Sequence, residues 1–153
     1  MIFRAVVAVA SLVSGSVAYY LHLWKLGAVA APVCTAGGGC ATAQFSWYGW
    51  FLGVDVALIG TVGYAALLVV AALGLAPRWR DARWPTIALA ALVVPAVLFT
   101  LRLKYGEFVV LRVFCPWCAV STVAITLCAI MVALDWRRLE RLGAPVAEDE
   151  ATA

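Results

Sequence analysis

The chain has 153 residues, of which 66% are hydrophobic and only 12% are charged. A soluble domain is about 45–50% apolar and about 25% charged, so this composition excludes an ordinary soluble fold and indicates an integral membrane protein. The formal net charge of +3 does not indicate nucleic-acid binding, because the basic residues stand at the ends of apolar runs, as they do beside membrane spans.

Four apolar segments are long enough to cross a bilayer, and they predict an all-α integral membrane fold, a bundle of four transmembrane helices. The spans are expected at about residues 5–24, 51–75, 85–101 and 113–134. A signal peptide competes for the first segment, but its apolar run continues past a candidate cleavage site to Trp24, which favours a retained helix. We expect one membrane domain over residues 1–142 and a disordered cytoplasmic tail over 143–153.

The loop between the first two spans carries Cys34 and Cys40, separated by a glycine-rich stretch, and then turns aromatic. Aromatic clusters favour the headgroup level of a membrane, so one interpretation is an interfacial belt. The other is a short element that lies across the mouth of the bundle as a lid over an apolar pocket, and both can hold together. Asp55 follows near the start of the second span, where it is either a functional acid or a solvated interfacial one.

The third loop leads into Cys115-Pro116-Trp117-Cys118. A C-x-x-C pair indicates redox chemistry or half of a metal site. Zinc would need two more soft ligands at close spacing, and the single histidine, His22, is expected to be an interfacial polar residue, so no metal site is expected. Cys128 lies deep in the fourth span, where a cysteine behaves as a small hydrophobic residue.

Four spans place the first and third loops on the same side of the membrane, so both cysteine pairs face one compartment. The positive-inside rule puts the side richer in basic residues in the cytoplasm. Both termini are therefore expected there, and the cysteines are expected outside the cytoplasmic (inner) membrane, where disulfides persist. Seven basic residues lie on one side and four on the other: Arg4, Arg78, Arg80, Arg83, Arg137, Arg138 and Arg141 against Lys25, Arg102, Lys104 and Arg112.

The fourth helix starts on the outer side, so its positive dipole end stabilises a thiolate at its first turns. Arg112, three residues before Cys115, is expected to add to this effect, and Cys118 lies one turn deeper. A mobile thiol pair beside a fixed pair at an apolar pocket forms a relay from an external dithiol protein to a lipid-soluble quinone.

The chain resembles the vitamin K epoxide reductase family in its small bacterial form, over nearly the whole length from the first helix through the fourth. The motifs that carry the resemblance are Cys34-x5-Cys40, Ser46 six residues further on, Gly53 with Gly60-Thr61-Val62-Gly63-Tyr64, and Cys115-Pro116-Trp117-Cys118-Ala119-Val120-Ser121. The family fold is a four-helix bundle around a quinone.

The resemblance implies a role for each cysteine of the two pairs. Cys34 would be attacked by the reduced partner, Cys40 would exchange with Cys115, and Cys118 would face the quinone. Ser46 would support the thiols from the loop, beside the charge effect expected of Arg112. With the aromatic lid and Asp55 added, the residues expected to contact the quinone, menaquinone or ubiquinone, are Cys118, Thr122, Asp55, Trp50 and Phe51.

Two departures from the family pattern bear on this assignment. Thr122 stands where some members carry a quinone-contacting tyrosine, so a hydroxyl remains and the ring is lost. Many bacterial relatives also carry a fused thioredoxin-like domain that this chain does not have, so a separate extracytoplasmic partner with a thioredoxin fold, of the DsbA type, is implied. The expected activity is a quinone-linked thiol–disulfide oxidoreductase that supports disulfide formation.

Other functions compete with this one. A DsbB-type oxidase does the same work, but there the C-x-x-C pair belongs to the first loop, the reverse of the order seen here. The protein could instead reduce a quinone or an epoxide for its own sake. Outside enzymes, a membrane carrier or a structural protein with static disulfides remains open, and thiol trapping separates these from a redox enzyme.

Overall fold

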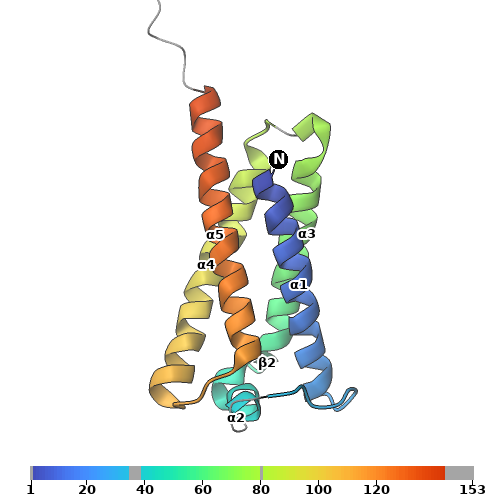
Figure 1. Cartoon of the computed structure of the whole chain (residues 1–153), viewed down its shortest axis with the longest axis vertical. Helices are drawn as coiled ribbons and strands as arrows, with labels where there is room; N and C mark the ends of the chain where they lie inside the picture. The colour runs from blue at the N-terminus through green and yellow to red at the C-terminus, as the bar shows by residue number, and fades with distance from the viewer. Residues whose placement is uncertain (1, 35–38, 80, 144–153) are drawn as a thin grey trace, which may run out of the picture.

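The structure, a computed structural model, describes residues 2–34, 39–79 and 81–143. Four long helices run alternately up and down (Figure 1): α1 (Ile2–Lys25), α3 (Val56–Leu75), α4 (Trp84–Tyr105) and α5 (Pro116–Gly143). α1 packs mainly against α3 and α5, and α4 closes the bundle by packing against the same two helices. Each of the four is long and apolar enough to cross a membrane, so the predicted four-span all-α fold is confirmed.

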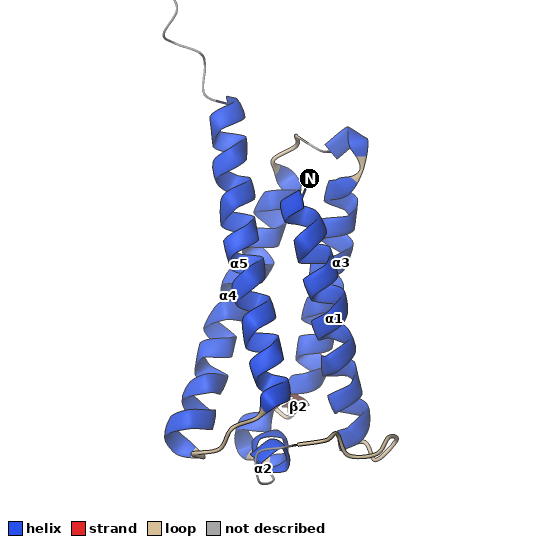
Figure 2. Cartoon of the chain, in the orientation of Figure 1, coloured by secondary structure: helices blue, strands red, loops and turns tan. Residues whose placement is uncertain are grey.

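Four of the shorter elements gather at one end of the bundle, and the start of α1 and the end of α5 lie toward the other end (Figure 2). They are α2 (Gly39–Phe45), the 3₁₀ turn η1 (Trp47–Gly49), and the antiparallel strands β1 (Trp50–Phe51) and β2 (Val54–Asp55). Leu52 and Gly53 form the turn of this hairpin, with φ of 52° and 80°. We call residues 39–55 the cap, because they cover the end of the bundle where the cysteines lie.

Several helix ends differ from those expected. The second span begins at Val56 instead of residue 51, because the hairpin occupies the preceding residues and the Asp55 side chain accepts the Ala57 N–H to cap the helix. The third continues through Tyr105 into a π-helical turn, η3 (Gly106–Val110), instead of ending at 101. The fourth begins at Pro116 instead of 113 and continues to Gly143 instead of ending at 134, and the first begins at Ile2 instead of 5. The tail expected over 143–153 lies, beyond Gly143, outside the described residues.

A buried ion pair joins the four helices at the end opposite the cap, beside the 3₁₀ turn η2 (Pro77–Trp79). Arg4 on α1 donates to Asp135 on α5 at 2.8 Å and to the carbonyl of Gly74 on α3 at 2.7 Å. It also donates to Thr86 on α4 at 3.0 Å, and Thr86 donates to Asp135 at 2.7 Å. Separating the helices here would leave a buried charge without its partner, which costs free energy. These contacts therefore hold the four helices together at this end.

Apolar side chains fill the bundle interior and also cover its outside. Cys128 is fully buried within the core, which suits a small apolar side chain. A large exposed apolar surface fits contact with lipid. The core comprises Val7, Tyr64, Leu67, Ala71, Leu89, Val93, Ile125, Cys128 and Val132. Large outward-facing side chains include Val9, Leu12, Val62, Val69, Leu98, Val123 and Ile130.

Candidate active site

The first cysteine pair forms a disulfide that ties the loop after α1 to the start of α2. Cys34 and Cys40 are joined with their Cα atoms 6.1 Å apart, and the Cys40 N–H also points at the Cys34 sulfur at 3.3 Å. Cys34 is half-buried, whereas Cys40 is almost completely covered. Cys34 is therefore the more accessible residue of this pair.

The second pair lies where α5 begins, and both members carry free thiols. Cys115 is the residue immediately before the helix and is fully buried, and Cys118 is in its first turn and half-buried. The Cys118 N–H points at the Cys115 sulfur at 3.3 Å. A hydrogen bond from the Cys118 thiol lowers the pKa of Cys115 to about 7, although burial opposes this. Cys115 is therefore the member of the pair that is ready to act as a thiolate.

Backbone packing brings the two pairs together. A Cβ atom added at Gly39 would lie only 2.5 Å from the carbonyl oxygen of Phe114, so the first residue of α2 lies directly against the chain just before Cys115. Trp117, inside the C-x-x-C sequence, donates its indole N–H to the carbonyl of Val33 at 3.1 Å. Each residue in these two contacts is next to a cysteine, so the cap positions one pair beside the other.

Glu107 holds the second pair from the other side. Its Oε1 accepts the backbone N–H of Cys115 at 2.6 Å, and its Oε2 accepts from the ammonium of Lys104 at 2.6 Å. Both residues fall in the loop expected between the third and fourth spans, but Lys104 lies in the last turn of α4 and Glu107 lies on its π-helical extension η3. The available signal was an acid inside an otherwise apolar segment with a lysine three residues before it.

A cavity of about 490 Å³ lies inside the bundle beneath the cap. Its walls are mostly apolar and come from all four long helices, while its polar groups include Gln44, Lys104, Glu107, Cys118 and Thr122. The Gln44 amide contacts the Cys118 sulfur at 3.4 Å. Apolar walls with a few convergent donors fit a quinone, which is a flat ring with two carbonyl acceptors.

The residues expected to contact the quinone divide into two groups. Cys118, Thr122 and Phe51 line the cavity. Thr122 donates its hydroxyl to the carbonyl of Cys118 at 2.8 Å, so its oxygen is held one turn below the reactive sulfur. Trp50 and Asp55 are not part of the cavity wall. Both lie on the side of the hairpin away from the cavity, where they are paired across the two strands. There the Lys25 ammonium lies 5.4 Å from the centre of the Trp50 ring.

Asp55 is the centre of a separate buried cluster. It accepts from the Lys25 ammonium at 2.5 Å and from His22 at 2.7 Å, besides the N–H of Ala57. Burial alone raises the pKa of Asp55, but these three hydrogen bonds outweigh it and leave the pKa below its ordinary value. Lys25 also donates to the carbonyl of Gly49 at 3.0 Å. The cluster therefore fastens the cap to α1 and α3, and His22 is a structural partner within it.

Ser46 and Arg112 are expected from the sequence to support the thiols, but among the described contacts neither residue binds a cysteine of either pair. Ser46 donates to the carbonyl of Ala43 at 3.0 Å and so stabilises the turn after α2. Arg112 has a left-handed backbone, with φ of 53°, in the turn between η3 and Cys115. The basic group whose charge lowers the Cys115 pKa is Lys104.

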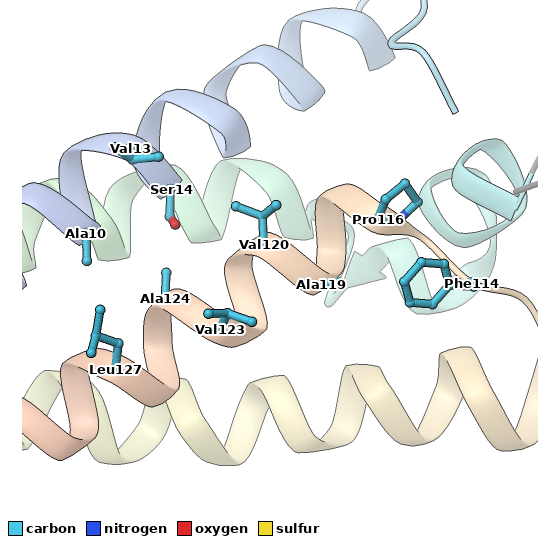
Figure 3. A pocket seen from close by; sticks show the side chains of 10 residues that line it. All are labelled: Ala10, Val13, Ser14, Phe114, Pro116, Ala119, Val120, Val123, Ala124 and Leu127. Atoms are coloured by element: carbon cyan, nitrogen blue, oxygen red, sulfur yellow. The ribbon is translucent and has the colours of Figure 1, made fainter. Parts of the chain in front are cut away.

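A second hollow, also about 490 Å³ in volume, lies on the outside of the bundle between α1 and α5 (Figure 3). Of the described residues that line it, none is charged and none is a cysteine. The chemistry therefore belongs to the cavity beneath the cap, which the Cys118 sulfur reaches. The lining consists of Ala10, Val13, Ser14, Phe114, Pro116, Ala119, Val120, Val123, Ala124 and Leu127.

The fold and the site together define a multi-pass membrane protein with two adjacent cysteine pairs at the mouth of an apolar cavity. The sequence model of the Vitamin K epoxide reductase family matches residues 5–133. The chain therefore belongs to the vitamin K epoxide reductase family, and the resemblance read from its motifs is confirmed. Members of this family are oxidoreductases that generally use quinone-type substrates and thiol–disulfide partners.

Proposed function

We propose that this protein is a quinone-linked thiol oxidase that regenerates the disulfide of an exported, thioredoxin-fold partner of the DsbA type. The observation that carries the proposal is the position of Cys118. This residue lines the cavity, and the chain just before its C-x-x-C motif lies against the start of α2. The charge distribution supports cysteines that face outward from the cytoplasmic membrane and termini that lie in the cytoplasm.

The first steps are thiol–disulfide exchanges between the partner and the cap. A partner thiolate attacks Cys34, the half-buried sulfur, and breaks the Cys34–Cys40 bond. The second partner thiol then attacks the mixed disulfide, so the partner leaves oxidised and Cys34 and Cys40 are left as thiols. Two electrons and two protons have entered the cap.

The second exchange moves these electrons to the fixed pair. Cys40, packed next to the Phe114 backbone through Gly39, attacks Cys115 of an oxidised Cys115–Cys118 pair. The Cys34–Cys40 bond closes again, and Cys115 and Cys118 are left reduced, the arrangement seen in this structure. A bound menaquinone or ubiquinone supplies the two-electron oxidising capacity that closes the fixed pair. Cys118, which lines the cavity, would face it, while Gln44 and Thr122 hold this sulfur and its backbone in place.

The test uses purified protein in detergent, a short-chain quinone and a reduced DsbA-type partner, with quinone absorbance as the readout. Steady quinone reduction is expected, and it should disappear when any of Cys34, Cys40, Cys115 or Cys118 is changed to Ala. Cys128→Ala, a substitution in the core away from the site, is the control that should keep the activity. If no dithiol donor reduces quinone, the disulfides are static and the proposal is refuted.

A further inference from the structure

Lys104 and Glu107 connect the fixed thiol pair to the cavity wall. Both line the cavity, as Cys118 does, and they are the only charged side chains among the described residues that line it. Glu107 binds the Lys104 ammonium through one oxygen and the Cys115 N–H through the other, each at 2.6 Å. A cation is thereby held beside the thiols, at the same end of the cavity.

Proton balance at this site requires an acid besides the two cysteines. Closing the Cys115–Cys118 bond releases two electrons, and a hydroquinone forms only when two protons arrive with them. Cys115 stands at a helix start that favours its thiolate. A thiolate and a thiol bring two electrons but a single proton, that of Cys118, so the second proton must come from another group.

We propose that Lys104 is this acid and donates the second proton to the quinone oxygen, with Glu107 as the residue that positions it. The inference rests on the proposed function. In the balanced step, the Cys115 thiolate and the Cys118 thiol form an S–S bond and give up two electrons and one proton. The Lys104 ammonium gives up the other proton and becomes a neutral amine. Hydroquinone leaves with both protons, and Lys104 regains its own from water.

The surroundings favour Lys104 over the other polar groups of the cavity. Glu107 acts as an acceptor on both oxygens. The hydroxyl of Thr122 already donates to the carbonyl of Cys118, and that of Tyr64 lies within 3.0 Å of both the carbonyl and the hydroxyl of Ser121. The Lys104 side chain is 16% exposed, against 5% for Glu107, so water reaches the ammonium for its reprotonation. Tyr48, which also lines the cavity, is the competing donor.

The first measurement does not depend on turnover. In a Cys118→Ala background, infrared difference spectra are recorded on a bound short-chain ubiquinone analogue, with Lys104 kept, changed to Arg, or changed to Met. A hydrogen bond from a cation lowers the carbonyl stretching frequency. The lowered band is expected with Lys and with Arg, and it should be lost in Lys104→Met. A band that stays lowered with Met would place Lys104 away from the quinone and overturn the proposal.

The second measurement separates proton donation from charge, with all cysteines present. Fully reduced protein is mixed with the quinone analogue, and its single-turnover reduction is followed. Arginine keeps the charge and the hydrogen bonds but is not deprotonated in proteins. Because general acid catalysis contributes about 10²–10⁴-fold, both Lys104→Arg and Lys104→Met should lose at least about 100-fold. Tyr48→Phe tests the competing donor, and Tyr105→Phe, which changes an exposed residue of α4 outside the cavity wall, is the control that should stay within about threefold of the unmodified protein.

Each remaining outcome decides the matter. If Lys104→Arg keeps the unmodified rate, Lys104 provides charge only and the proposal is wrong. If Tyr48→Phe loses the rate and Lys104→Arg does not, Tyr48 is the acid. If the unmodified protein reduces no quinone with either its own thiols or a partner, the proposed function fails first, and the infrared comparison still reports whether Lys104 touches the bound ring.

Discussion

Changing Gly39 to Ala would separate the two cysteine pairs by a defined distance. The added Cβ would lie 2.5 Å from the Phe114 carbonyl oxygen and 3.3 Å from the carbonyl carbon and the amide nitrogen of the same residue. An unstrained contact needs about 3.5 Å, so the oxygen must retreat by about 1 Å. Because all three are backbone atoms, no side-chain rotation absorbs the displacement, and the chain before Cys115 must move away from α2.

This displacement acts on the step that joins the pairs. Misplacing reacting groups by about 1 Å costs on the order of 100-fold in rate. Partner-driven quinone reduction should therefore fall by roughly 100-fold in Gly39→Ala. Without the close contact, a Gly to Ala change at an unstrained position would leave the free energy of unfolding unchanged or raise it by about 0.4–1 kcal/mol. With the close contact, the same change should lower the free energy of unfolding.

The assay compares two electron donors on the same protein. A reduced thioredoxin-fold partner must pass electrons through Cys34 and Cys40, whereas a small dithiol that reduces Cys115 and Cys118 directly does not. Gly39→Ala should lose the first activity and keep the second. Ala41→Ser, which adds one atom on the exposed side of α2, is the matched control and should keep both. Partner-driven turnover in Gly39→Ala within about threefold of the unmodified protein would refute the reasoning.

Three further predictions follow from the same geometry. Cys34→Ala combined with Cys118→Ala leaves Cys40 and Cys115 as neighbours, and mild oxidation should trap them as a disulfide that changes gel mobility. Cys118→Ala alone removes the hydrogen bond that lowers the pKa of Cys115 to about 7, so the midpoint of Cys115 alkylation against pH should rise toward about 8.5, and alkylation at pH 7 should slow roughly tenfold. Asp55→Asn should destabilise the protein by about 3 kcal/mol at neutral pH, because it breaks a buried ion pair. Asp55 has a lowered pKa in the folded state, so its contribution is lost as the pH falls through that pKa, and thermal unfolding in detergent should show the two proteins converge in acid.

The controls for these three predictions are other variants of the same protein. Cys128→Ala in every alkylation and trapping experiment removes the remaining thiol, which lies in the core. A failure to trap Cys40 with Cys115 would contradict the packing of α2 against the motif. An unchanged alkylation midpoint would mean that the Cys118 thiol does not stabilise the thiolate. Asp81→Asn is the control for Asp55→Asn. The Asp81 side chain is 67% exposed and pairs with Arg138 at the surface, where an ion pair contributes about 0–1 kcal/mol to stability.

The extent of each helix was less predictable than its existence. A polar run after residue 101 predicted a loop, yet α4 continues into a π-helical turn there. Lys104 and Glu107 neutralise each other across one turn, so their charges do not end the helix. In contrast, the apolar residues from Phe51 to Val54 predicted a helix and form a hairpin, because Leu52 and Gly53 take positive φ and Asp55 starts the helix after them.

The division of roles among candidate residues also depended on the fold. Asp55 and Lys104 are both charged residues near a membrane surface, and of the two only Asp55 is among the quinone contacts expected from the sequence. The structure places Asp55 in a cluster with Lys25 and His22 that fastens the cap, and it places Lys104 on the cavity wall. The difference is one of direction, since Asp55 faces α1 whereas Lys104 faces the interior.

The sequence by itself determined the number of spans, their order and the shared side of the two cysteine pairs. These follow from composition and segment length, because a lipid-embedded backbone must satisfy its own hydrogen bonds and so crosses as whole helices. Only the tertiary structure decided which side chains meet. Gln44 and Cys118 are 74 positions apart, and Arg4 and Asp135 are 131 apart. Such contacts depend on how each helix is rotated about its axis and how the cap lies over the bundle, which the packing of all four helices sets together.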